Sequence, residues 1–206
     1  MLALVVPAVL LDLFPVYAAR APTSAINIEG QNQRLNVNAG TTTWDDFKLR
    51  QAPDTVINSS KAEGTGLATG GNNGRWNLTG KVHIEYQTTI LDADTAVVVF
   101  ADGQIQSIEV HGKPASFSRP GKSEGARNQG TAEMIAYDGG ARRLRFTGHT
   151  WYSFGPFEGT ADKPMVYNLD TSEFFSENTD DSRVHMTVSP DKRVPTPRTP
   201  DRKTAE

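Results

Sequence analysis

The sequence contains no cysteine among its 206 residues, which excludes disulfide scaffolds, thiolate zinc sites and cysteine nucleophiles. It also lacks a basic excess, because 21 Lys and Arg stand against 24 Asp and Glu. A dedicated nucleic-acid binder would carry a strong positive balance, so that class is disfavoured. The four histidines, at positions 83, 111, 149 and 185, lie too far apart for a local metal motif. We therefore expect neither a metal nor a cofactor.

Long apolar runs are scarce, and the one that stands out covers residues 1–14. A helix that spans a bilayer needs about 20 apolar residues, so this run is too short to cross a membrane comfortably. It is typical of a secretory signal, and we predict a signal peptide over residues 1–18 with cleavage near Ala18. An uncleaved membrane anchor and a buried N-terminal helix are the alternatives.

Short segments in which apolar and polar residues alternate follow from residue 26 onward. Residues 82–86, 108–111, 144–147 and 184–188 alternate in this way, and turn signals such as Asp102-Gly103 separate the segments. Alternation with period two indicates strands with one buried and one wet face. The sequence therefore predicts an all-β sandwich, barrel or solenoid over residues 19–188.

Two polar segments interrupt this pattern. Residues 118–130 are rich in glycine and lack apolar periodicity, so we expect a loop between two strands. Residues 189–206 contain four prolines and five Lys or Arg, so we expect an extended, disordered, basic tail.

The apolar faces of the expected strands form one continuous row. In a closed sandwich this row would be an ordinary core, whereas in an open β fold it would line an apolar groove suited to acyl chains. Periodicity alone leaves both interpretations open. The inward side chains are predicted to be Val82, Ile84, Tyr86, Val97, Val99, Ile108, Val110, Phe117, Ile135, Tyr137, Leu144, Phe146, Tyr152, Met165 and Tyr167.

Catalytic constellations are sparse. Asp92 and Asp94 are the one candidate carboxylate pair for acid/base chemistry, although solvated residues at a strand start are the simpler interpretation. A carbohydrate-active β enzyme that uses this pair, and a structural adaptor without a lipid ligand, are the alternatives to a lipid-binding function.

Five segments, taken in order, carry a resemblance to a known family. They are WNLTGKVHI at 76–84, LDADTAVVVF at 91–100, IQSIEVHGKPASF at 105–117, TAEMIAYDGGARRLRFTG at 131–148 and FEGTADKPMVYNLDTSEF at 157–174. Together they resemble the OstA-like family of periplasmic lipopolysaccharide transport proteins. LptA, the periplasmic part of LptC and the amino-terminal domain of LptD belong to this family.

The resemblance implies a β-jellyroll of stacked antiparallel hairpins that is open along one side. It implies a non-enzymatic periplasmic protein whose apolar groove, lined by the inward residues above, shields the acyl chains of lipid A and bridges inner- and outer-membrane components. The implied partners are lipopolysaccharide, other OstA-like proteins and possible further copies in a head-to-tail arrangement, joined through edge strands. The expected partner-edge residues are Ile26, Ile28, Leu35, Val37, Val184, Met186 and Val188.

Overall fold

The computed structural model describes residues 25–66, 73–121, 126–177 and 184–189. The predicted signal peptide at 1–18 and the tail from residue 190 lie outside these residues. The described chain forms one sheet of 13 strands, which confirms the all-β prediction. The strands are β1 (Ile26–Asn36), β2 (Thr41–Gln51), β3 (Thr55–Thr65), β4 (Gly74–Tyr86), β5 (Thr89–Ala101), β6 (Gln104–Pro120), β7 (Arg127–Asp138), β8 (Arg143–Thr147), β9 (Thr150–Phe154), β10 (Phe157–Ala161), β11 (Met165–Asn168), β12 (Phe174–Ser176) and β13 (Val184–Val188).

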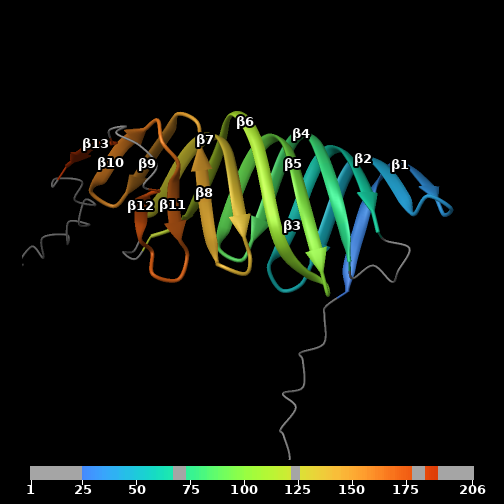
Figure 1. The fold of residues 1–206 in the computed structure, drawn as a ribbon. Coiled ribbons are helices and arrows are strands. Elements are labelled where there is room, and N and C mark those ends of the chain that lie inside the picture. The colour runs from blue at the N-terminus through green and yellow to red at the C-terminus, as the bar shows by residue number, and fades with distance from the viewer. Residues whose placement is uncertain (1–24, 67–72, 122–125, 178–183, 190–206) are drawn as a thin grey trace, which may run out of the picture.

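Strands β1 to β7 are long and pair consecutively in an antiparallel meander (Figure 1). After β7 the sheet divides. The first part of β7 (residues 128–131) pairs with β9, which continues to β10 and β13. The second part (residues 134–138) pairs with β8, which continues to β11 and β12. The division shows that β7 contributes to two separate walls.

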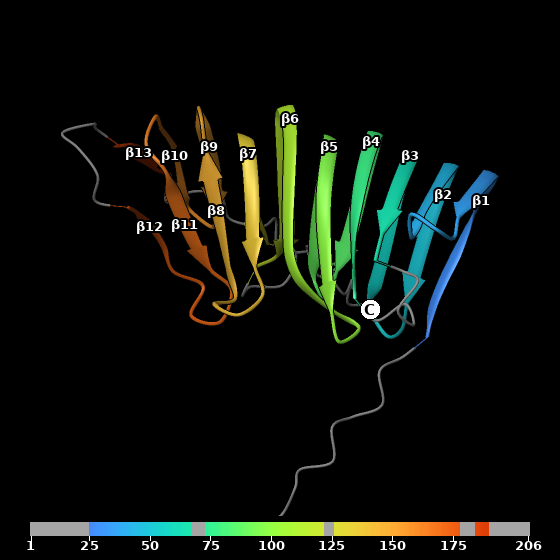
Figure 2. The ribbon, with the colours of Figure 1, turned by 45° about the vertical axis from the view of Figure 1, so that its right-hand side comes forward.

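We call these walls the β9 wall and the β8 wall. Following the register back from β7, the β9 wall contains the first parts of β1, β3, β5 and β7 and the second parts of β2, β4 and β6. The β8 wall contains the complementary parts. The two walls run the length of the molecule, from β1 at one end to β12 and β13 at the other (Figure 2).

Each long strand changes wall where its ladder is interrupted, and we call this row of interruptions the bend line. The register shifts at residues 58–61 in β3, 79–82 in β4, 92–95 in β5 and 111–115 in β6. Positive φ angles occur there at Asp46 (47°), Gly80 (77°) and Lys81 (48°). Interrupted pairing with such angles bends a strand, so the local conformation folds the sheet over on itself.

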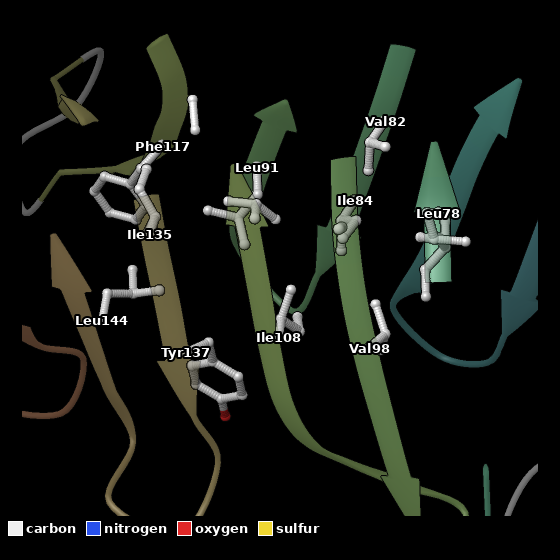
Figure 3. Packing of buried hydrophobic residues seen from close by; sticks show 14 of the residues in the cluster. Leu78, Val82, Ile84, Leu91, Val98, Ile108, Phe117, Ile135, Tyr137 and Leu144 are labelled. Atoms are coloured by element: carbon white, nitrogen blue, oxygen red, sulfur yellow. The ribbon is translucent and has the colours of Figure 1, made fainter. Parts of the chain in front are cut away.

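The core lies between the two walls and follows from the alternation along each strand. In β4, Trp76 and Leu78 before the bend and Val82 and Ile84 after it are all at most 2% exposed. Neighbours of these residues alternate to the outer surface, as a half-buried strand requires. Figure 3 shows side chains of both walls converging on a shared interior.

The loop prediction for residues 118–130 is largely wrong. Strand β6 continues to Pro120 and β7 begins at Arg127, with Ser118 opposite Gln129 in the ladder. Backbone pairing, which is independent of side-chain polarity, extends this hairpin beyond the apolar pattern. Gly155 and Pro156 form the turn that separates β9 from β10.

Candidate functional site: an apolar interior between two walls

Twelve of the predicted inward residues lie in the buried core, each at most 5% exposed. Tyr86 is partly buried and packs against the same cluster. The structure therefore brings this row together as one interior that both walls share. The twelve are Val82, Ile84, Ile108, Val110, Phe117, Ile135, Tyr137, Leu144, Phe146, Tyr152, Met165 and Tyr167.

Val97 and Val99 do not point inward, and this part of the prediction is wrong. The inward residues of β5 after its bend are Ala96, Val98 and Phe100, which are at most 3% exposed. Because successive side chains on a strand point to opposite faces, the two valines lie on the outer face. The run Val97-Val98-Val99 contains no polar residue that would show which side chains face outward. The sequence alone therefore fits either orientation of this strand.

Fourteen buried core residues were missed, and they are spread over β2 to β7 and β10. Phe47, Leu49 and Ile57 are at most 2% exposed and belong to the same cluster. The spacing of Phe47 and Leu49 is a period-two signal that could have revealed them. The interior therefore begins closer to β1 than the sequence suggested.

Aromatic contacts connect the walls across the interior. Phe47 of the β9 wall lies 4.6 Å, between ring centroids, from Trp76 of the β8 wall, and Phe117 lies 5.7 Å from Phe146. Nearer the end of the chain, Phe154 stacks on Tyr167 at 5.0 Å. The side chains of the two walls interdigitate, so protein atoms fill the interior along most of its length.

A pocket of about 460 Å³ lies at the end formed by β9 to β13. Its volume falls within the range of small-molecule sites. Half-buried Phe174 and exposed Phe157 and Met186 are part of its lining. We call this the C-terminal pocket; it lies where the two walls consist of separate short strands.

Tyr86 of the β9 wall and Tyr137 of the β8 wall face each other on the side of the interior opposite the bend line, with ring centroids 5.5 Å apart. Burial, followed by the charge and hydrogen bond of Tyr86, raises the pKa of Tyr137 to about 12. Tyr137 is thus neutral at physiological pH and supplies no charge to the interior.

The predicted partner-edge residues differ in their surroundings. Leu35, Val37 and Met186 are 62%, 72% and 59% exposed, and Val184 and Val188 are also exposed. Ile26 and Ile28 instead pack against the core through their side chains. Within the described residues, β1 pairs only with β2, β12 only with β11 and β13 only with β10, which leaves one backbone edge of each strand unpaired.

The alternative carboxylate pair lies outside the interior. Asp92 Oδ1 lies 2.6 Å from Nδ1 of His83, whose Nε2 lies 3.1 Å from Glu85 Oε1. Burial lowers the pKa of His83, but the hydrogen bonds and charges of Asp92 and Glu85 outweigh it and raise the pKa overall. Asp94 is exposed, so nothing in this arrangement forms a carboxylate-lined cleft.

No helix in the described part of the chain is long and apolar enough to cross a membrane. Within the same residues, no group of three or more His, Asp or Glu side chains is placed to hold a metal ion.

Comparison with known families identifies a class of transport proteins to which this fold belongs. A family model described as LptA/(LptD N-terminal domain) LPS transport protein matches residues 57–173, more than half of the chain. The chain therefore belongs to this family of lipopolysaccharide transport proteins.

Solved structures agree on the fold. The crystal structure of LptH, the LptA homologous periplasmic component of the lipopolysaccharide transport device from Pseudomonas aeruginosa, superposes with a TM-score of 0.50. The match covers 81% of this chain and 96% of LptH at 12% sequence identity. No curated protein sequence matches the chain.

Proposed function

We propose that the protein holds the acyl chains of lipopolysaccharide between its two walls and carries the lipid across the periplasm without covalent chemistry. One observation carries this proposal: a single apolar interior, continuous from Phe47 to Phe174, runs through an open sheet of a lipopolysaccharide transport family. The proposal includes export, with removal of residues 1–18.

Lipid insertion requires the walls to separate, because the inward side chains are already buried against one another. Acyl chains would replace protein contacts with apolar contacts of the same kind, and each buried CH₂ group contributes about 0.8 kcal/mol. The sugar portion would stay outside, where the outer faces are polar. The free energy of exchanging protein contacts for lipid contacts is therefore close to zero, which suits a carrier that must also release its lipid.

The unpaired edges support a role in bridging between proteins. Within the described residues, each wall contains ten strands in sequence, from β1 to β12 in one and from β1 to β13 in the other. In an antiparallel path of ten strands, the last strands run opposite to the first. A second copy stacked in the same orientation could therefore add its β1 antiparallel to both β12 and β13, which satisfies the unpaired backbone groups.

Photo-crosslinking tests the lipid site directly. A photoreactive residue at Ile84 or Phe146, both 0% exposed, should capture lipopolysaccharide in cells. The same residue at the outward neighbours Glu85 or Arg145 is the matched control and should capture much less. Equal or absent capture at the inward positions of folded protein would contradict the proposal.

A structural adaptor with a dry interior is the second candidate, and the close packing of the core favours it. Protein purified from the periplasm without detergent separates the two. Lipid found by mass spectrometry at near one molecule per chain supports the carrier, whereas lipid-free protein supports the adaptor.

A further inference from the structure

The free margins of the two walls, where the hairpin turns lie, meet along a line that we call the rim seam. Near β1, Gln51 at the end of β2 donates a hydrogen bond from Nε2 to the carbonyl oxygen of Gly103, at 2.7 Å. Gln51 is only 7% exposed, so its amide is shielded from water. This bond connects the β9 wall to the turn between β5 and β6 in the β8 wall.

Other contacts cross the rim seam farther along. In the middle, Tyr86 meets Tyr137. Toward the C-terminal end, Asn128 donates from Nδ2 to the hydroxyl of Tyr167 at 3.0 Å, and Arg119 donates from Nη1 to the carbonyl oxygen of Leu169 at 3.2 Å. These contacts repeat the connection made by Gln51 along the molecule.

Three of the four contacts share one geometric rule. Gln51 on β2 reaches the turn after β5, Tyr86 on β4 reaches β7, and Arg119 on β6 reaches the residue after β11. Each of these connections joins strands that are three places apart in the strand order. The regular offset shows that the walls meet obliquely along one continuous seam.

The opposite side of the interior is different in kind. At the bend line, β2 to β7 pass from wall to wall as unbroken backbone. Parting the walls there would require disruption of the chain path and its ladders. At the rim seam, among the residues that the structure describes, only side-chain contacts and hydrogen bonds hold the walls together, so this is the side that can open.

The polar contacts resist opening more than the apolar ones do. An acyl chain replaces the apolar contacts of the interior with others of similar strength. It offers no hydrogen-bond partner to a buried amide, and an unsatisfied buried donor is costly. The buried amide of Gln51 therefore adds a barrier that lipid cannot offset.

We propose that these contacts form a latch, and that acyl chains are admitted only when the rim seam parts, with the Gln51–Gly103 bond limiting the rate. This inference rests on the proposed lipid-carrier function and adds a specified route and a specified barrier to it. It makes Gln51 a residue that controls access without being part of the apolar lining.

Tying the seam shut gives the first test. The chain has no cysteine, so Gln51→Cys with Gln104→Cys can be joined selectively by a short bismaleimide. The control is Glu63→Cys with Asn77→Cys, which are cross-strand neighbours within one wall. Uptake of cis-parinaric acid, followed by its fluorescence in the full-length protein, should slow more than tenfold in the tied seam and stay unchanged in the control.

Loosening the latch gives the second test. Gln51→Ala should take up the same probe about fivefold faster, the effect expected from loss of one neutral hydrogen bond. Gln104→Ala, an exposed glutamine beside the same turn, should match the wild type. Thermal melts establish whether each variant is folded. If Gln51→Ala does not fold, the crosslinked pair alone tests the latch.

The outcomes separate the latch from the underlying function. Uptake by the wild type at a rate that crosslinking leaves unchanged would overturn the latch while preserving the lipid carrier. Absence of uptake by the wild type, with either cis-parinaric acid or lipopolysaccharide, would overturn both.

Discussion

The region from β2 to β7 and the region from β8 to β13 form the same two walls by different means. In the first region, strands of 11 to 17 residues cross the bend line and belong to both walls. In the second, strands of 3 to 5 residues each belong to one wall. Only in the second region are the walls held together without a shared strand.

This difference shows which parts of the two walls are fixed in position and which can separate. Backbone continuity fixes the wall positions between β2 and β7, whereas aromatic packing around Phe174 holds them from β8 onward. The C-terminal pocket lies in the second region. We therefore expect local opening there to require less free energy than opening in the middle.

The largest effect should follow from a cavity in the continuous region. Trp76 is 2% exposed and packs on Phe47, so Trp76→Ala should lower the free energy of unfolding by about 3–5 kcal/mol. Urea denaturation measures this. Thr79→Ala, at an exposed site on the same strand, is the control; an equally small loss in both would show that Trp76 is not a core anchor.

A smaller effect should follow from overfilling the same place. A Cβ on Gly64 would lie 2.8 Å from the Trp76 ring, so Gly64→Ala should cost about 1–3 kcal/mol. In the double variant with Trp76→Ala the added methyl group has room, and the two losses should not add. Strict additivity in urea denaturation would contradict this contact.

In the split region the effect should be local. Phe174 lies 4.5 Å from Tyr152 and 4.8 Å from Phe154 between ring centroids. Phe174→Ala should remove about 1–2 kcal/mol of aromatic packing and reduce hydrogen-exchange protection in β9 to β13. Strands β2 to β7 should keep their protection, and so should all strands in the control Phe175→Ala, at an exposed position. An equal loss of hydrogen-exchange protection in all strands would contradict the proposed difference between the two regions.

The smallest effect concerns the outer face of the continuous region. The raised pKa of His83 means that its ion pairs stabilise the fold below about pH 6.5 and that this contribution is lost as pH rises through the folded-state value. The stability of the wild type should therefore decline slightly over that window, and His83→Gln should show no such decline. An NMR titration that placed the pKa of His83 below 6.5 would contradict this.

Much of the fold could be predicted because alternation is a local signal. Val82 and Ile84, or Leu144 and Phe146, are flanked by polar residues that fix their parity, and their burial was predicted correctly. Val97 and Val99 were misplaced because a run of valines fits either face. The bends were not predicted, since positive φ at Asp46 and Lys81 depends on the fold around them rather than on a glycine signal.

The candidate site shows the same limit. Composition and alternation located the apolar row, but whether it is filled depends on how two walls approach in space. The rim contacts of Gln51 and Asn128 join residues 52 and 39 positions apart, and no short-range pattern marks such a pair. Their partners are a backbone carbonyl and a tyrosine hydroxyl, and nothing in the sequence identifies either group as a hydrogen-bond partner.

The antiparallel path has a consequence for how proteins of this shape can change in length. Removing or adding a single strand would reverse the direction of one terminal edge and spoil its match to an incoming β1. Removing or adding a hairpin preserves the match and alters the length by about 10 Å. Such a carrier can therefore be fitted to wider or narrower distances only in steps of two strands.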